Sequence, residues 1–281
     1  MTAISIQNLQ KSFPTFSLKS VSFDVQQGTI MGFVGENGAG KSTTIKCILN
    51  VLQKEKGFIE IFGRDHVAEE VKIKEEVGVV YDDLPFPETL SGKDIEKFMH
   101  RLYKRWDERL FYQLLKQFKI APSKKVKDLS RGMKMKLSIA IALAHHPKLL
   151  ILDEPTSGLD PIVRDEILDL FLAFMQDEEH TILFSSHITS DLEKIADTIT
   201  FIHEGEIVFS ENKDVLLYEY AIWKGSAEEM KDLPEDAIVR RRNGIYGVEA
   251  LVRKKRINRV FPITKPTIEE LMVFFTKGEA V

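Results

Sequence analysis

Gly35-Glu36-Asn37-Gly38-Ala39-Gly40-Lys41-Ser42 is the stretch that decides the fold, because it fits the phosphate-loop pattern of Gly, any four residues and Gly-Lys-Ser/Thr. The apolar segment 29–34 predicts a buried strand before it, and residues 43–52 predict a helix after it. Glycines let backbone N–H groups turn toward an anion, and a helix start carries about half a positive charge. The alternative, a glycine-rich turn with a chance lysine, explains neither flanking element.

The residues of this loop have separate predicted roles. Lys41 brings a full positive charge to the outer phosphates, and the Ser42 hydroxyl is placed to bind Mg²⁺. We expect the triphosphate to be held by the loop and the first helical turn, that is by Asn37, Gly38, Ala39, Gly40, Lys41, Ser42 and Thr43.

Two adjacent carboxylates follow a second short apolar run. Residues 149–152 read as a buried strand of a parallel sheet, and Asp153 and Glu154 come directly after it. Buried carboxylates are costly without partners, and a Mg²⁺-nucleotide beside the phosphate loop is a suitable one. Asp153 would then hold Mg²⁺, and Glu154 would act as general base toward the attacking water. A helix-capping pair at a strand end is the alternative.

A third motif resembles a known family. Leu129-Ser130-Arg131-Gly132-Met133 is similar to the signature loop of ABC ATPases, usually Leu-Ser-Gly-Gly-Gln. Ser157-Gly158-Leu159-Asp160 follows the acidic pair as the family's D-loop does, and His187 follows the apolar segment 181–184 as its switch histidine does. The resemblance covers roughly residues 1–215. Each later motif alone is weak, but their order is specific.

The resemblance implies an α/β P-loop NTPase fold with a mixed sheet core. It places a small antiparallel β subdomain around residues 1–28 and an α-helical subdomain at about 84–145, with the ABC ATPase domain ending near residue 215. We expect a small α+β accessory region over 216–281. In it, residues 238–252 predict a small sheet turned at Asn243-Gly244, and Thr267 with Glu270 predicts a capped last helix.

The family's remaining site roles are carried over onto matching positions. Ser130 and Gly132 would meet the γ-phosphate of ATP bound by a second subunit, and His187 would reach the γ-phosphate of its own site. In the plainer interpretation Ser130 caps the helix that follows, and His187 is an ordinary loop residue. Asp160 fits both a helix cap before Pro161 and a contact across the dimer.

Two positions depart from the family pattern. Arg131 replaces the first signature glycine, and it could add a phosphate contact or point to solvent. Asp82 stands where the family has a glutamine that binds Mg²⁺. A carboxylate binds Mg²⁺ well but repels phosphate when the metal is absent. We therefore expect ATP binding to depend on Mg²⁺ more strongly than it would with glutamine, which an Asp82→Gln variant tests.

The adenine base needs a flat partner. Phe13 and Phe16 lie in the early loop where ABC domains place a stacking aromatic, and Phe13 after Lys11-Ser12 is the better match. Either phenylalanine could instead belong to the core of the small sheet. Because stacking ignores the base edge, weak discrimination between ATP and GTP would follow.

Composition fits a soluble enzyme. A net charge of −4 argues against generic nucleic-acid binding, and Cys47 as the single cysteine excludes an internal disulfide. No apolar run approaches the roughly 18 residues of a membrane span, and the first residues do not resemble a signal peptide.

The resemblance points to the ATP-binding and hydrolysing subunit of an ABC transporter at the cytoplasmic face of the membrane. Its partners would be a transmembrane permease and a second ATPase chain, as homodimer or heterodimer, with ATP and Mg²⁺ as ligands. The short tail is typical of bacterial exporters. The alternatives are a soluble ABC ATPase acting on ribosomes or DNA, and a regulatory module that binds ATP without hydrolysing it.

Two basic runs stand out near the end of this acidic chain. They are Arg240-Arg241-Arg242 and Arg253-Lys254-Lys255-Arg256. A solvated strand face is the favoured interpretation. Contact with anionic lipid is the alternative, since each basic residue near such a surface contributes about 1 kcal/mol.

Overall fold

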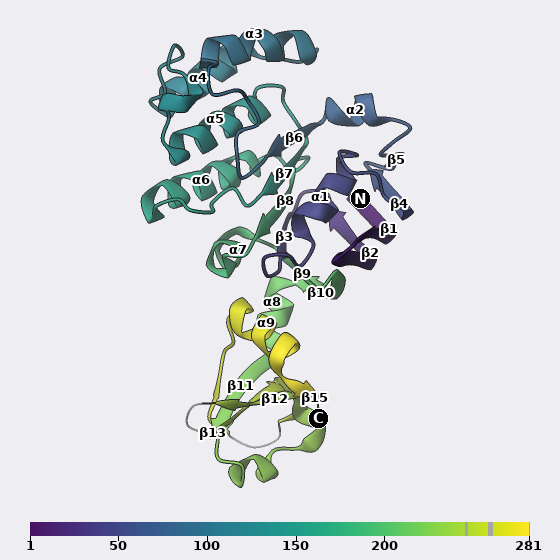
Figure 1. Cartoon of the computed structure of the whole chain (residues 1–281). Helices are drawn as coiled ribbons and strands as arrows, with labels where there is room; N and C mark the ends of the chain where they lie inside the picture. Colours follow the sequence, from purple (N-terminus) through teal and green to yellow (C-terminus); the bar gives the residue numbers. More distant parts are fainter. Residues whose placement is uncertain (245–246, 258–260, 281) are drawn as a thin grey trace.

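The structure, a computed structural model, describes residues 1–244, 247–257 and 261–280 of the chain. The described strands form three sheets, and Figure 1 shows a broad upper part with a narrower C-terminal part below it. The arrangement confirms the predicted α/β class, with a mixed core sheet, an antiparallel β part, a helical part and an α+β appendage.

The central sheet has six strands in the order β10-β9-β3-β8-β7-β6. β10 pairs antiparallel with β9, and the remaining neighbours are parallel. Every residue of β3, β7 and β8 is buried, as expected for parallel strands covered on both faces. The strands span Ile30–Val34 (β3), Val77–Val80 (β6), Leu149–Asp153 (β7), Thr181–Ser186 (β8), Thr198–His203 (β9) and Glu206–Asn212 (β10).

An antiparallel sheet and a group of helices flank this core. The sheet runs β2-β1-β4-β5, and the helices α3, α4 and α5 pack around apolar side chains of their own, including Ile95, Phe111 and Leu137. The four strands span Thr2–Phe13 (β1), Phe16–Gln26 (β2), Lys56–Ile61 (β4) and Arg64–Asp65 (β5). The helices of the upper part are α1 (Lys41–Ile48), α2 (Glu70–Lys74), α3 (Gly92–Leu102), α4 (Glu108–Gln117), α5 (Arg131–Leu143), α6 (Pro161–Phe174) and α7 (Thr189–Ile195), with a 3₁₀ turn at Val126–Asp128.

Helix α1 is shorter than the predicted 43–52. It begins at Lys41 and ends at Ile48, because Asn50 adopts a left-handed φ of 52°. The N–H of Asn50 donates to the Cys47 carbonyl and that of Val51 to the Lys46 carbonyl, at 3.1 and 2.9 Å. This pair of hydrogen bonds is the Schellman motif that closes a helix.

The C-terminal part is a five-stranded sheet with two helices. Its strand order is β14-β11-β13-β12-β15. The predicted turn at Asn243-Gly244 is wrong, because the β12–β13 ladder continues through both residues and pairs them with Val248 and Gly247. The joining residues 245–246 lie outside the described part. The elements are α8 (Lys213–Glu219), β11 (Tyr220–Gly225), β12 (Ile238–Gly244), β13 (Gly247–Arg253), β14 (Ile263–Thr264), α9 (Ile268–Lys277) and β15 (Glu279–Ala280), with 3₁₀ turns at Glu229–Asp232, Glu235–Ala237 and Lys254–Arg256.

Helix α9 joins the C-terminal part to the core. Thr267 and Glu270 form the predicted capping box at its start. Ile268, Leu271 and Phe274 are fully buried in the same apolar cluster as strands β3, β7 and β8. The appendage therefore shares a hydrophobic core with the body to which it is attached. Among the described residues, none of the helices has both the length and the apolar character needed to cross a bilayer.

Candidate active site

The phosphate loop connects β3 to α1, as predicted. Gly40 precedes α1 with a φ of 115°, a conformation that an L-residue rarely adopts. A Cβ at Gly40 would also lie 2.7 Å from Leu18 Cδ2 and 2.9 Å from Phe16 Cζ. Within the part of the chain that the structure describes, no side chain caps the first turn of α1. Its N–H groups are therefore available to an anion, as a bound phosphate requires.

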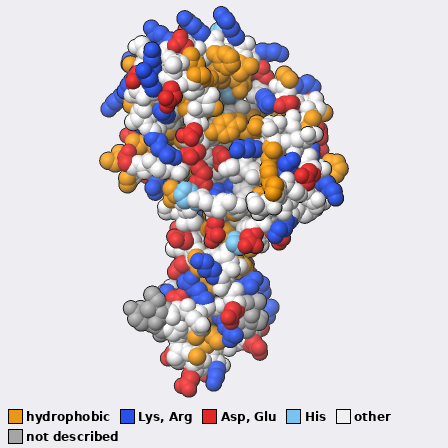
Figure 2. All heavy atoms as spheres, viewed as in Figure 1, with side chains coloured by type: hydrophobic (Ala, Val, Ile, Leu, Met, Phe, Trp, Pro, Cys, Tyr) orange, Lys and Arg blue, Asp and Glu red, His pale blue; other side chains and the backbone are white. Residues whose placement is uncertain are grey.

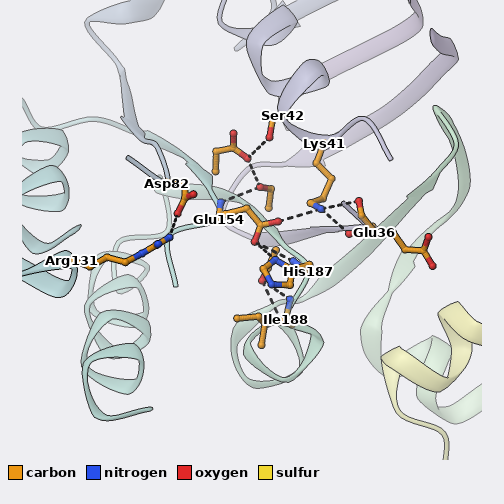
Figure 3. A network of polar contacts seen from close by, with 12 residues as sticks. Glu36, Lys41, Ser42, Asp82, Arg131, Glu154, His187 and Ile188 are labelled. Carbon is orange, nitrogen blue, oxygen red and sulfur yellow. Dashed lines mark hydrogen bonds and ion pairs between the residues drawn. The ribbon is translucent and has the colours of Figure 1, made fainter. Parts of the chain in front are cut away.

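Lys41 is buried at the start of α1. Its side chain is 5% exposed, and Nζ donates to the carbonyls of Gly35 at 2.7 Å and Glu36 at 3.3 Å. Nζ also lies 3.2 Å from Glu154 Oε1, and this carboxylate side chain is 14% exposed. The ammonium group thus sits under the loop that should receive the phosphates, and at present it is paired with the proposed catalytic carboxylate (Figure 3).

At the carboxyl ends of β7 and β8, the buried Asp153 and Ser185 form an oxygen cluster with the partly buried Ser42 of α1. Asp153 Oδ1 accepts hydrogen bonds from Ser42 Oγ at 3.2 Å and Ser185 Oγ at 2.8 Å. Asp153 is only 7% exposed. Carboxylate and hydroxyl oxygens are the ligands that Mg²⁺ prefers, and Asp153 has no cationic partner among its described hydrogen bonds and ion pairs. Ser42 and Asp153 therefore fit the predicted metal role.

Glu154 and His187 meet because their strands are neighbours. The β7–β8 register pairs Asp153 with Ser185, and the Glu154 N–H donates to the Ser185 carbonyl at 3.1 Å. Glu154 itself has a φ of 54°, which turns its side chain toward the following strand's end. Its Oε2 lies 2.6 Å from His187 Nδ1 and accepts from the His187 N–H at 3.3 Å (Figure 3). The structure thus brings together Lys41, Glu154 and His187, three residues with separate predicted roles around the γ-phosphate.

The signature residues lie on a different helix start. Ser130 is exposed, and its Oγ accepts from the Met133 N–H at 3.3 Å, so the plainer capping interpretation is confirmed. Gly132 packs against Val163 of α6, where a Cβ would lie 3.0 Å from Val163 Cγ1. Asp160 likewise caps α6, with Pro161 at its first position. These contacts do not exclude a second role for Ser130 and Gly132, because capping leaves the hydroxyl at the surface.

The two departures from the family pattern touch each other. Arg131 Nη2 donates to Asp82 Oδ1 at 2.6 Å, and the two side chains are about half exposed. Arg131 therefore does not simply point to solvent. Sequence reasoning treated the two positions separately and missed the contact. Their opposite charges at two otherwise neutral positions were the signal for it.

A hollow beside the phosphate loop fits the predicted base site. It has a volume of about 570 Å³ and is lined by Phe13, Phe16 and the loop residues 36–39. Phe13 is 41% exposed, whereas Phe16 packs against the core under Gly40. Phe13 is therefore the phenylalanine whose ring remains available. His203 and Lys19 also line the hollow, and sequence reasoning did not identify them.

Two ionisable groups near the site are shifted by burial. Burial raises the pKa of Tyr81, and the negative charge of Asp153 adds to the shift. Burial also raises the pKa of Asp191 in α7, although Arg164 lies 3.7 Å away and opposes the shift. In both cases burial disfavours the charged form of the side chain.

Comparison with known proteins agrees with this geometry. A family model described as ABC transporter matches residues 18–157. The lantibiotic transport ATP-binding protein SrtF of Streptococcus pyogenes is 37% identical over 214 residues, covering 75% of this chain and 91% of the relative. The bacitracin transport ATP-binding protein BcrA of Bacillus licheniformis is 35% identical over 210 residues, covering 74% of this chain and 69% of the relative.

Solved structures show the same fold. An ATP-binding subunit of an ABC transporter superposes with a TM-score of 0.67 at 26% identity, covering 76% of this chain and 92% of the other. A dimeric ATP-binding cassette bound to ADP and Pi superposes with a TM-score of 0.66 at 21% identity, covering 74% and 98%. Together with the phosphate loop, the acidic pair and the signature loop, these matches show that the chain belongs to the family of ABC transporter ATP-binding proteins.

Proposed function

We propose that this chain is the ATP-hydrolysing subunit of an exporter, acting through a separate membrane subunit by ATP-driven dimer closure. The observation that carries the proposal is the cluster of Lys41, Glu154 and His187 beside the Ser42–Asp153 pair. A charge for phosphate, a base for water and oxygens for a metal lie at one sheet edge. A module that only binds ATP has no need for Glu154 in this position.

The binding step follows from the described contacts. The free N–H groups of α1 and the Lys41 ammonium hold the triphosphate, so that Lys41 exchanges Glu154 for phosphate oxygens. Ser42 and Asp153 would hold Mg²⁺, which neutralises phosphate charge when bound. Loss of its Lys41 partner leaves Glu154 free to accept a proton from water.

The chemical step uses Glu154 and His187. Glu154 takes a proton from the attacking water, whose oxygen forms a bond to the γ-phosphorus as the bond to the leaving β-phosphate oxygen breaks. The products are ADP and inorganic phosphate. The side chain of His187, held 2.6 Å from Glu154, orients the carboxylate and reaches toward the γ-phosphate.

In a closed dimer the exposed signature loop would contact ATP bound by the other chain. Ser130 and Gly132 of a second copy would approach the γ-phosphate of this site, so that ATP bridges two chains until hydrolysis removes the bridge. Because one chain carries every motif, a homodimer with two competent sites is the simplest assembly. A heterodimer with another ABC ATPase is the second form of the same proposal.

The membrane subunit would dock in an apolar cavity between the helical part and the core sheet. The cavity measures about 360 Å³, and its lining includes Val51, Phe98 and Leu102, which are 62%, 57% and 58% exposed. Figure 2 shows hydrophobic side chains gathered on this part of the surface. A short amphipathic helix of a transmembrane permease fits such a groove, and the chain would then be held at the cytoplasmic face of the membrane.

Two observations weigh against the lipid interpretation of the basic tail. Arg241, Arg242, Arg253 and Arg256 each lie within 4 Å of a carboxylate, at 3.4, 2.6, 3.9 and 3.5 Å. The tail also lies at the opposite end of the molecule from the apolar cavity (Figures 1 and 2). Liposome sedimentation with and without anionic lipid tests whether the basic residues of the tail bind such lipid.

Co-purification tests the proposed assembly. A co-expressed permease subunit should be retained by the wild-type protein and lost with a Phe98→Asp, Leu102→Asp variant. The matched control is Phe58→Asp, because Phe58 is 72% exposed but does not line the cavity. ATP binding by both variants should remain normal. Retention of the membrane subunit by the cavity variant would contradict the docking site.

A further inference from the structure

Arg131 and Asp82 come from two separate parts of the nucleotide-binding body. Arg131 is the first residue of α5, directly after Ser130, and Asp82 lies two residues beyond the end of β6. Their side chains are 49% and 47% exposed, and Nη2 and Oδ1 are 2.6 Å apart. The contact therefore ties the signature helix to the loop that follows β6 within a single chain (Figure 3).

The guanidinium group of Arg131 has a second support. Gly158, in the loop after the acidic pair, has a φ of 65°. A Cβ at this position would lie 2.9 Å from Arg131 Cζ and 3.1 Å from Nε. The Arg131 guanidinium therefore lies against the backbone of Gly158, whose positive φ favours glycine. It contacts two loops, one after β6 and one after β7.

Asp82 lies at the edge of the nucleotide cleft. The parallel β6–β7 ladder ends with Val80 paired with Leu152, so Asp82 and the acidic pair Asp153-Glu154 follow the carboxyl ends of two neighbouring strands. Neighbouring strands lie about 4.8 Å apart, so the loop after β6 borders the catalytic cluster. Asp153 and Glu154 already place two carboxylates there. Without a partner, Asp82 would add a third negative charge facing an incoming triphosphate.

We propose that Arg131 is a positioning residue that neutralises Asp82 at the cleft edge and so lets the site accept ATP before a metal is bound. The inference rests on the proposed function only in requiring that the chain binds ATP. The sequence predicted that Asp82 alone repels the phosphates of ATP when no metal is bound. The charge of Arg131 reduces this repulsion. The dependence of ATP binding on Mg²⁺ is then set by the pair rather than by Asp82 alone.

A double-mutant comparison in EDTA tests the inference without hydrolysis or dimerisation. The dissociation constant of a fluorescent ATP analogue is measured at low protein concentration for the wild type, Arg131→Gly, Asp82→Gln and the double variant. Arg131→Gly should weaken metal-free binding by about two- to fivefold, the range expected for a half-exposed charge pair. The double variant should bind like the wild type, and Arg131→Lys should retain most of the affinity.

Four controls separate this role from a structural one. In Arg131→Gly the loss should shrink in 0.5 M salt and with saturating Mg²⁺, which a misfolded site would not show. Lys148→Ala breaks a comparable exposed pair, Lys148–Glu179 at 2.7 Å, at the far end of β7 and should leave binding unchanged. Unfolding curves check that each variant is folded.

Two results would overturn the inference. Unchanged metal-free binding in Arg131→Gly overturns the inference. A double variant as weak as Arg131→Gly also overturns it, because Arg131 would then act on phosphate directly or on the fold. If the wild type fails to bind ATP even with Mg²⁺, the proposed function fails instead.

Discussion

Glu154 Oε2 lies 2.6 Å from His187 Nδ1, while Oε1 of the same carboxylate lies 3.2 Å from Lys41 Nζ. The Glu154 carboxylate thus joins Lys41 of the phosphate loop to His187 at the end of β8. In the proposed mechanism this cluster holds Glu154 in the cleft before ATP binds, and binding of phosphate by Lys41 would release it. The proposed exchange would couple ATP binding to activation of Glu154 within one chain.

Glu154→Gln should reduce steady-state ATP turnover at least 100-fold while ATP binding is retained. Glutamine has the same shape but does not accept a proton from water at neutral pH, and general-base catalysis contributes about 10²- to 10⁴-fold. Phosphate release measured at saturating ATP and Mg²⁺ checks this. A turnover rate near that of the wild type would show that Glu154 is not the base.

Lys41→Ala should weaken ATP binding by about tenfold or more, because a hydrogen bond to a charged group contributes about 1.5–3 kcal/mol. Lys46→Ala is the matched control, since Lys46 lies on the same helix but is exposed. Titration calorimetry of both variants gives the comparison. Equal affinities of the two variants would remove Lys41 from the phosphate site.

Phe13→Ala should lower the affinities for ATP and GTP by the same factor. Base stacking on an aromatic ring contributes about 1–3 kcal/mol and does not depend on the base edge. Phe58→Ala, which removes an exposed ring elsewhere on the same sheet, should change neither affinity. A loss for ATP alone, or no loss at all, would argue against stacking at Phe13.

Acidification below the ordinary histidine pKa should destabilise the fold through His145. Burial lowers the pKa of His145, whose ring is 2% exposed, stacks on Tyr103 and has Nε2 3.2 Å from the Val77 carbonyl. The unfolded chain, in which the histidine pKa is about 6.5, therefore binds a proton at a higher pH than the folded chain. The contribution of His145 to stability is fully present above about pH 6.5 and is lost as the pH falls toward the pKa of His145 in the folded chain.

His145→Gln should reduce this pH dependence. Urea unfolding at several pH values between 5 and 8 measures the free energy of unfolding for both proteins. Part of the dependence should persist in the variant, because burial also lowers the pKa of His66. An unchanged slope below pH 6.5 would show that His145 is protonated equally in both states.

Local sequence patterns predicted the parts of the site that local rules control. The phosphate loop, the capping residues Ser130, Asp160 and Thr267, and the strand before Asp153 follow from residue type and spacing within a few positions. The pairing of β7 with β8, which brings Glu154 to His187, was not predicted and is seen only in the structure. Local sequence patterns determine where a helix or strand forms, but not which other element it pairs with.

The incorrect or missing predictions also have physical reasons. Helix α1 ends because Asn50 adopts a left-handed conformation. The predicted helix extended past this residue because apolar residues continue at helical spacing to Leu52. Asn243-Gly244 has turn chemistry, yet the ladder with β13 continues through it. The Asp82–Arg131 contact joins residues 49 positions apart, a separation over which periodicity carries no information.

The mass of the Glu154→Gln protein with and without ATP tests the central claim most directly. Sedimentation equilibrium at saturating ATP and Mg²⁺ should give twice the 32.2 kDa mass of one chain, and ADP should give the single mass. Adding Ser130→Arg should abolish the ATP-dependent dimer, because the signature loop then no longer fits the partner's phosphate. A mass of one chain at every ATP concentration would contradict the claim that ATP bridges two copies of this protein.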